Sequence, residues 1–117
     1  MNSRQGKLEN RVLNALWRLE ENGQENIDVT NVQNIINSKS KQWAYTTVKT
    51  VLDRLVEKNV ITRFKIGKKY SYKSDSSRDE LGEAAIKKLA KQYFNGDMEE
   101  LYSAVKNMLN EVVTLSR

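Results

Sequence analysis

The segment from residue 45 to residue 73 most constrains the fold, because a helical pattern passes directly into a strand pattern there. Over residues 45–59, apolar side chains recur every three or four positions, which predicts one buried helix face. Residues 60–66 and 69–73 are instead rich in β-branched and aromatic side chains, and Gly67 between them can form a tight turn. A helix followed by a hairpin is therefore predicted. The hairpin register stays open, because loops of two and of three residues both fit.

The positive charge of the chain is concentrated around this segment. Residues 39–73 hold ten Lys or Arg and two acids, a net charge of +8. The other 82 residues hold ten Lys or Arg and thirteen acids, a net charge of −3. The formal net charge of +5 thus comes from one region. A localised basic patch is typical of a surface that binds nucleic acid.

Two shorter helical patterns precede this segment. The first covers residues 7–21, has an apolar stripe that starts at Leu8, and stops at Asn22-Gly23. The second begins at Thr30, where Thr30 and Gln33 have the spacing of a capping box, and ends near Asn37. Residues 37–42 are polar and predict a turn. Three helices followed by a basic hairpin indicate a winged helix-turn-helix.

Two further helices are expected after the hairpin. Residues 77–80 form a second capping box that opens a helix to about residue 94, and Asn95-Gly96 ends it. Asp97 then caps a last helix with an apolar stripe like that of a coiled coil. The stripe could pack on the chain's own core, but a helix pair outside the main domain has little to bury against. We therefore expect a homodimer interface formed by Met98, Leu101, Tyr102, Val105, Met108, Leu109 and Val112.

The expected fold is mainly α with a small β-hairpin wing (α+β). Residues 1–74 are predicted to form a winged-helix DNA-binding domain, and residues 75–117 a helical dimerisation region. No apolar run approaches the roughly 20 residues of a membrane span, and no apolar signal region opens the chain. We therefore expect a cytoplasmic protein without a membrane partner.

Several kinds of chemistry are not expected. Cys and His are both absent, which removes disulfides, thiolate zinc sites, and Cys or His catalysis. Neither Gly67 nor Gly96 lies in a glycine-rich phosphate loop, and the adjacent acids Glu99 and Glu100 point apart on a helix. We predict no enzyme activity, no cofactor and no metal bound through Cys or His.

The exposed face of the helix over residues 45–59 is rich in Thr and basic side chains, which can contact phosphates and base edges. The same face could belong to an ordinary surface helix, and a basic hairpin can simply prevent edge pairing. Together, however, the two favour DNA binding. Trp17 is predicted to be structural, and Tyr70 and Tyr72 to cover the core. Trp43 is left open between a packing residue and a DNA wedge, and Tyr45 between a phosphate contact and packing.

Residues 47–58, preceded by Trp43, resemble the recognition helix of the penicillinase-repressor family. Residues 63–72 resemble its wing, residues 12–17 its first helix, and residues 94–98 the joint between its dimerisation helices. The resemblance implies a bacterial homodimeric repressor that binds double-stranded DNA at a TACA/TGTA-type inverted repeat. By position, it implies DNA contacts from Thr46, Thr47, Lys49 and Thr50, and it implies that Arg54 braces the wing or a carboxylate rather than reading a base. It implies phosphate contacts from Arg63, Lys65, Lys68 and Lys69. From their own chemistry, Tyr45 and Arg54 are also counted as candidate DNA contacts.

The chain departs from the family pattern at two points. Copper-responsive members carry a Cys-rich tail, whereas this sequence has no Cys, so metal sensing by that route is not expected. Antibiotic-resistance members are cleaved at an Asn-Phe bond, whose place is taken here by Ala104-Val105. The inducing signal is therefore left open. Two other functions also stay open: a winged-helix protein-interaction module and a sequence-neutral nucleic-acid binder.

Overall fold

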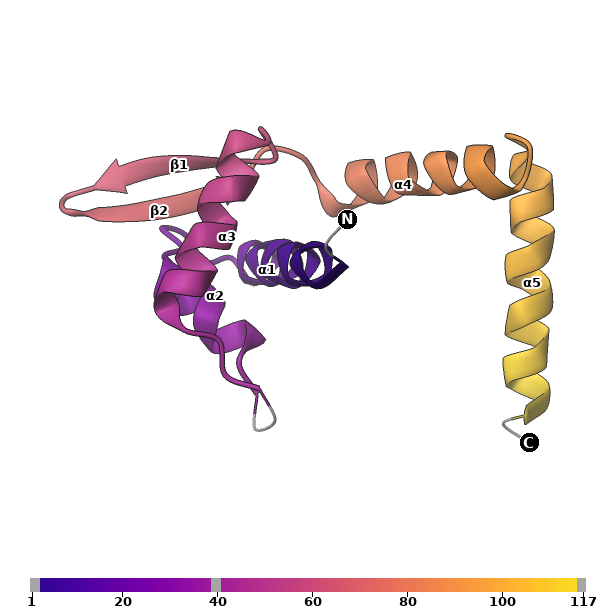
Figure 1. The fold of residues 1–117 in the computed structure, drawn as a ribbon, viewed down its shortest axis with the longest axis horizontal. Coiled ribbons are helices and arrows are strands. Elements are labelled where there is room, and N and C mark those ends of the chain that lie inside the picture. The colour runs from indigo at the N-terminus through magenta and orange to yellow at the C-terminus, as the bar shows by residue number, and fades with distance from the viewer. Residues whose placement is uncertain (1–2, 39–40, 116–117) are drawn as a thin grey trace. The chain divides into compact units, whose positions relative to one another are not determined.

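The computed structural model describes residues 3–38 and 41–115 of the chain (Figure 1). These residues form five helices and one antiparallel hairpin, which confirms the expected mainly α fold with a β-hairpin wing. The chain divides into two compact units, Met1–Arg78 and Asp79–Arg117. The elements are α1 (Ser3–Glu21), α2 (Val29–Ile36), α3 (Tyr45–Glu57), β1 (Ile61–Ile66), β2 (Lys69–Ser74), α4 (Arg78–Tyr93) and α5 (Met98–Leu115).

The core of the first unit lies where α1, α2 and α3 meet one another and the wing. Leu16 of α1, Val32 of α2 and Leu52 of α3 are completely buried, and Ile61 and Tyr72 of the wing are nearly so. Burying one such aliphatic side chain stabilises a fold by roughly 1.5–3 kcal/mol. Because α3 inserts four buried side chains (Val48, Val51, Leu52 and Leu55), its opposite face is fixed toward solvent.

The starts of α1 and α2 differ from the sequence-based expectation. α1 begins at Ser3 rather than residue 7, because its first turn carries no apolar side chain that periodicity could detect. The predicted Thr30–Gln33 capping box is wrong. Asp28 caps α2: its Oδ1 accepts from the amide of Asn31 at 2.8 Å, and Asn31 Oδ1 accepts from the amide of Asp28 at 2.9 Å. Asp and Asn make the same reciprocal pair as Thr and Gln would, two positions earlier.

α3 passes into the wing through a tight C-terminal turn. Asn59 adopts a left-handed conformation with φ of 62°, as expected of it as a helix stop. The amide of Val60 donates to the carbonyl of Leu55, and that of Asn59 to Val56, each at 3.0 Å. This is the hydrogen-bond pattern of a Schellman motif. The helix itself ends at Glu57, and β1 begins four residues later.

The wing resolves the hairpin register that the sequence left open. Ile66 pairs with Lys69, so the loop has two residues, Gly67 and Lys68. Gly67 has φ of 62° at the first loop position, as a type II′ turn requires. β2 extends one residue further than predicted, to Ser74, and β1 starts one residue later, at Ile61.

The two wing tyrosines have different surroundings. Tyr72 is 1% exposed, and its amide donates to the carbonyl of Ile27 at 2.8 Å, so it covers the core as predicted. The same prediction is wrong for Tyr70, which is 41% exposed. Both residues are on one face of β2 because they are two positions apart, but Tyr70 pairs with Lys65 close to the turn of the hairpin. The turn end of the hairpin extends away from the helices of the first unit (Figure 1).

The second unit consists of α4 and α5. Asn95 and Gly96 separate them with φ of 54° and 75°, and Asp97 caps α5 by accepting from the amide of Glu99 at 2.9 Å, as expected. Large apolar side chains in this unit are mostly exposed, whereas Leu101 is 7% exposed. Across the described ranges, none of the helices has the length and apolar character needed to cross a membrane.

Candidate nucleic-acid interface

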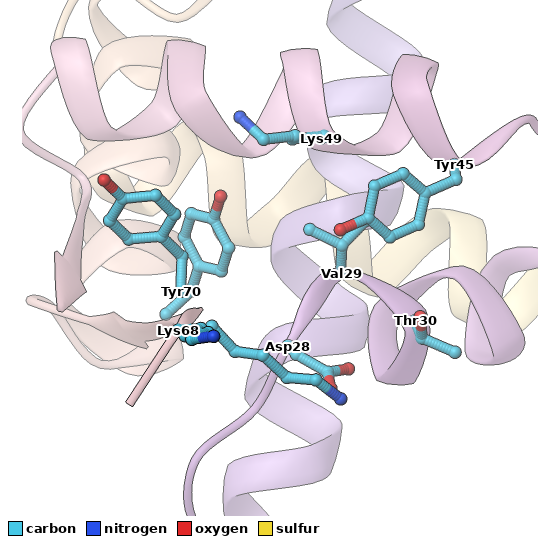
Figure 2. Close-up of a pocket in the computed structure, with 9 residues that line it drawn as sticks. Asp28, Val29, Thr30, Tyr45, Lys49, Lys68 and Tyr70 are labelled. Atoms are coloured by element: carbon cyan, nitrogen blue, oxygen red, sulfur yellow. The ribbon is translucent and has the colours of Figure 1, made fainter. Parts of the chain in front are cut away.

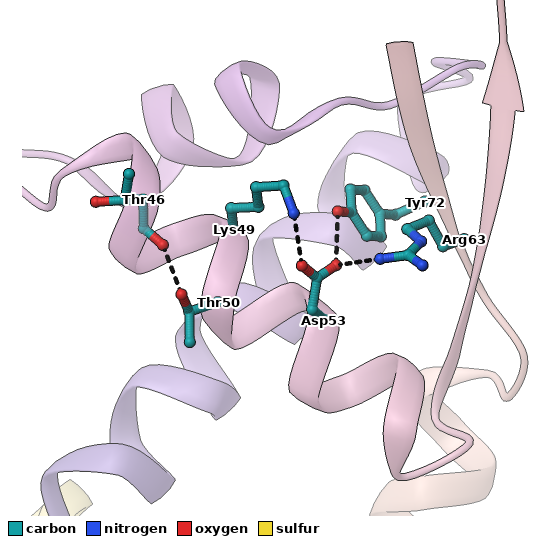
Figure 3. A network of polar contacts seen from close by, with 6 residues as sticks. All are labelled: Thr46, Lys49, Thr50, Asp53, Arg63 and Tyr72. Carbon is teal, nitrogen blue, oxygen red and sulfur yellow. Dashed lines mark hydrogen bonds and ion pairs between the residues drawn. The ribbon is translucent and has the colours of Figure 1, made fainter. Parts of the chain in front are cut away.

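The outward face of α3 carries the residues expected to meet DNA. Thr46 and Thr50 are exposed at its centre, whereas Lys49 and Asp53 beside them are half-buried. The hydroxyl of Thr50 donates to the carbonyl of Thr46 at 2.8 Å (Figure 3). The Thr50 donor is therefore used within the helix, which leaves its oxygen lone pairs and its methyl group for an outside partner.

One flank of α3 faces the start of α2 and the wing. Tyr45 and Lys49 line a hollow of about 180 Å³ there, together with Asp28, Lys68 and Tyr70 (Figure 2). Thr30, Lys69 and Tyr72 complete its lining, along with Val29. The hollow is therefore predominantly basic and aromatic, with a single carboxylate.

The other flank of α3 faces α1. Thr47 and Arg54 line a separate hollow there with Leu8, and Thr46 and Thr50 reach it from the outward face. The six residues predicted on the recognition helix thus share one side of α3 but divide between two flanks. Lys49 and Tyr45 lie toward the wing, whereas Thr47 and Arg54 do not.

The carboxylate of Asp53 joins α3 to both strands of the wing (Figure 3). Its Oδ2 accepts from Lys49 Nζ at 2.8 Å, one turn earlier on the same helix. Its Oδ1 accepts from the guanidinium of Arg63 on β1 at 3.1 Å and from the hydroxyl of Tyr72 on β2 at 3.0 Å. Asp53 therefore touches two of the cations predicted to contact DNA.

Sequence reasoning did not single out Asp53. The spacing of Lys49 and Asp53, four positions apart in a helix, was a usable signal for an ion pair. The contacts with Arg63 and Tyr72 depend on the hairpin register and could not be read from spacing. Arg63 makes an ion pair between the wing and α3, and Arg54, named as a possible brace, lines the hollow on the other flank of α3.

The ionisation of the three groups follows from this geometry. Burial by itself raises the pKa of Asp53, but hydrogen bonds from Lys49, Tyr72 and Arg63 outweigh it, so the pKa lies below its ordinary value. The hydrogen bond to Asp53 raises the pKa of Arg63. Burial, followed by the hydrogen bond to the Asp53 carboxylate, raises the pKa of Tyr72 well above 10.0. Asp53 is thus held charged and Tyr72 neutral.

The cations of the wing, Arg63 included, are exposed to solvent. Arg63 places its guanidinium carbon 4.6 Å from the centre of the Tyr70 ring, and Lys65 Nζ lies 5.7 Å from the same centre. Lys68 and Lys69 are exposed at the turn, and no ion pair with a described carboxylate involves either of them. The wing therefore presents exposed positive charge at its tip and an ion-paired cation, Arg63, nearer α3.

The turn before α3 is held by side chains at the end of α2. The amide of Trp43 donates to Asn37 Oδ1 at 2.7 Å, and its carbonyl accepts from Gln33 Nε2 at 2.9 Å. Lys41 places its ammonium 4.6 Å from the centre of the half-buried Trp43 ring. Trp17 is buried, and its indole N–H donates to the carbonyl of Ser76 at 3.1 Å, which accords with its predicted structural role.

The second unit carries the residues predicted for a dimer interface. Six of the seven are exposed by 46–66%, whereas Leu101 is 7% exposed. Sequence reasoning did not identify the exposed apolar side chains of α4. Ile86, Leu89 and Tyr93 are also exposed and have the spacing of one helix face, so the periodicity used for α5 could have found them.

The described side chains do not gather three or more His, Cys, Asp or Glu where a metal ion could be held. The family model for the penicillinase repressor matches residues 5–114, which is nearly the whole chain. The search of curated proteins found no match to this sequence. The matched range includes α2, α3, the wing, α4 and all of α5 except its last residue. The chain therefore belongs to the penicillinase repressor family, whose members are DNA-binding transcriptional regulators and not enzymes.

Proposed function

We propose that this protein is a sequence-specific repressor that binds, as a homodimer, an inverted-repeat operator in duplex DNA. The observation that carries the proposal is the outward face of α3, which presents Thr and Lys side chains beside a basic wing. α3 has 13 residues and is about 20 Å long, which suits it to the major groove. Its four buried side chains hold that face in one orientation.

Base contacts are assigned to Thr46, Thr47, Lys49 and Thr50. Lysine donates to the guanine O6 and N7 acceptors, and Thr supplies both a hydroxyl and a methyl group for thymine. Tyr45, which is 47% exposed at the start of α3, is assigned a phosphate contact through its hydroxyl. Arg54 lies at the edge of this face and is assigned a contact with the adjacent phosphate backbone of the DNA.

Phosphate contacts are assigned to the wing. Lys65, Lys68 and Lys69 are exposed along the hairpin, and Arg63 lies between them and α3. Such contacts supply affinity and register on the duplex but carry no base preference. They also make binding weaken as salt rises, because each neutralised phosphate releases condensed counterions.

The homodimer is supported by the apolar surface of the second unit. Among the described residues, ten of the fourteen exposed large apolar side chains lie between Ile86 and Val113. Monomeric proteins seldom expose so much apolar surface in one short region, and a second copy would cover it. We therefore assign DNA reading to residues 1–74 and dimerisation to residues 75–117. A two-fold dimer matches an inverted repeat, one half-site for each α3.

The resemblance to the family supports a TACA/TGTA-type repeat as the operator and steric blocking of a promoter as the mode of repression. It also supports a cytoplasmic location. Binding to a duplex that carries this repeat and to a scrambled duplex of equal length, measured by fluorescence anisotropy at about 150 mM salt, tests the proposal. We expect the repeat to bind about 10³-fold more tightly. Equal binding would indicate a sequence-neutral binder, and no binding would favour a protein-interaction module.

Variants separate base reading from phosphate binding. Thr47→Ala and Lys49→Gln should relax the preference at particular bases, because they remove contacts to base edges. Lys68→Ala and Lys69→Ala should weaken both duplexes alike and reduce the salt dependence by about one phosphate each. Unchanged base preference in the first pair would refute the assignment of the reading face to α3.

A further inference from the structure

Asp53 is an acid at the centre of a face proposed to bind a polyanion, and its position needs an explanation. It lies between Lys49 and Arg63, with contacts of 2.8 and 3.1 Å, and its carboxylate is also held by Tyr72. A carboxylate directed at DNA would oppose binding, because like charges repel. Here the carboxylate is directed at the protein's own cations instead (Figure 3).

We infer that Asp53 is a specificity-determining residue, whose carboxylate holds Lys49 and Arg63 away from the phosphates of random duplex and orients Lys49 for base contacts. The inference rests on the proposed DNA-binding function. It differs from the ordinary assignment of Lys49 and Arg63 as free cations, because each must give up a contact with Asp53 before it can reach a phosphate.

Lys49 can keep its bond to Asp53 while it contacts a base. An ammonium group has three donors, and only one is directed to Asp53 Oδ2. The other two remain for base acceptors in the major groove. Swinging to a phosphate would instead break the 2.8 Å ion pair. Asp53 therefore disfavours a contact of Lys49 with a DNA phosphate, and it leaves a contact of Lys49 with a base available.

The same carboxylate is itself fixed. The Tyr72 hydroxyl that bonds Asp53 Oδ1 belongs to a side chain that is 1% exposed, so it cannot follow Asp53 to a new position. Arg63 approaches from the other strand of the wing. Because contacts from both strands converge on one carboxylate, Asp53 also fixes the wing against α3. A positioned side chain discriminates between duplexes better than a mobile one.

The test compares Asp53→Asn with Glu57→Gln in the full chain. Both changes remove one negative charge from α3, but Glu57 is exposed one turn later and takes no part in this network. Binding to the TACA/TGTA repeat and to the scrambled duplex is measured by anisotropy over a range of salt concentrations. Thermal unfolding followed by circular dichroism shows whether each variant is folded.

Asp53→Asn should bind the scrambled duplex about 5- to 10-fold more tightly at ~150 mM salt, with a salt slope steeper by about one to two. Its preference for the repeat should fall at least ~10-fold, because a misdirected base contact costs about that much discrimination. Glu57→Gln should change the scrambled-duplex affinity by less than about 3-fold. A purely structural role for Asp53 would weaken binding to both duplexes instead.

Equal effects of the two variants on the scrambled duplex, or weaker binding of Asp53→Asn, would overturn the inference. If wild type binds both duplexes equally, the proposed sequence-specific function fails, but the scrambled-duplex comparison still decides the role of Asp53. If Asp53→Asn does not fold, the role of Asp53 is tested by comparing Lys49→Gln with Lys68→Gln. Lys68→Gln should lower the salt slope on scrambled duplex by about one, and Lys49→Gln by less than half as much. Equal decreases would overturn the inference.

Discussion

The hydroxyl of Tyr72 on β2 donates a hydrogen bond of 3.0 Å to the Asp53 carboxylate on α3. One end of Tyr72 thereby belongs to the core and the other to the polar network beside the reading face. Packing of the wing and ionisation of the reading face are thus coupled through a single side chain. The coupling requires a neutral Tyr72 phenol and a charged Asp53 carboxylate. It is therefore lost at high pH, where the phenol ionises, and at low pH, where the carboxylate is protonated.

At alkaline pH, the fold should lose stability through Tyr72. Its pKa is raised above the ordinary value of 10.0, so its contribution is fully present below about pH 10 and is lost as pH rises through the folded-state pKa. Tyr72→Phe should have a lower melting temperature at pH 7 but a smaller further decrease between about pH 9 and 11. Melting curves of Tyr45→Phe in the absence of DNA, changed at a side chain 47% exposed in the same unit, provide the control. Parallel pH profiles for the two variants would contradict the prediction.

At acid pH, the corresponding loss should come from Asp53. Its pKa lies below the ordinary 3.8, so its contribution is present above that value and is lost as pH falls through the folded-state pKa. Asp53→Asn should lower the melting temperature by roughly 4–8 °C at pH 7, which corresponds to about 1 kcal/mol for a domain of this size. The difference from wild type should shrink below about pH 4. A pH-independent difference would show that the charge of Asp53 contributes nothing.

Helical periodicity predicted α1, α2 and α3, because each of these helices buries an apolar stripe that the sequence displays. Periodicity placed the buried side chains of α3 correctly, and residue type placed the left-handed stop at Asn59. Periodicity could not place Asp53, because two of its three partners come from strands whose register is set by a two-residue loop. Local sequence chemistry predicted Thr30 as the cap of α2, whereas the hydrogen bonds between Asp28 and Asn31 place the cap two positions earlier.

The choice of cap is itself testable. Asp28→Ala removes the reciprocal pair with Asn31 and should destabilise the first unit by about 0.5–2 kcal/mol. Thr30→Ala, in the first turn of the same helix, leaves that pair intact and should change stability by less than about 0.5 kcal/mol. Urea unfolding of both variants measures the difference. A larger loss from Thr30→Ala would restore the capping box that the sequence suggested.

The second unit should separate into monomers when its exposed apolar face receives a charge. Met108→Asp is the informative change, because Met108 is 64% exposed in the single chain. Leu101→Asp would place a charge at a position that is only 7% exposed in the single chain, and so would disturb the fold of one chain as well as an interface.

Sedimentation equilibrium should show a dimer for wild type and weaker association, by about 100-fold or more, for Met108→Asp, because an unpaired carboxylate in an apolar interface costs several kcal/mol. Asn107→Asp adds the same charge at the neighbouring exposed position, outside the apolar stripe, and should remain dimeric. If Met108→Asp dimerises as well as Asn107→Asp, the two copies meet elsewhere. In that case the exposed side chains of α4, Ile86, Leu89 and Tyr93, become the next positions to change. A wild-type protein that is monomeric at all concentrations would refute the proposed homodimer, and with it the pairing of two α3 helices on an inverted repeat.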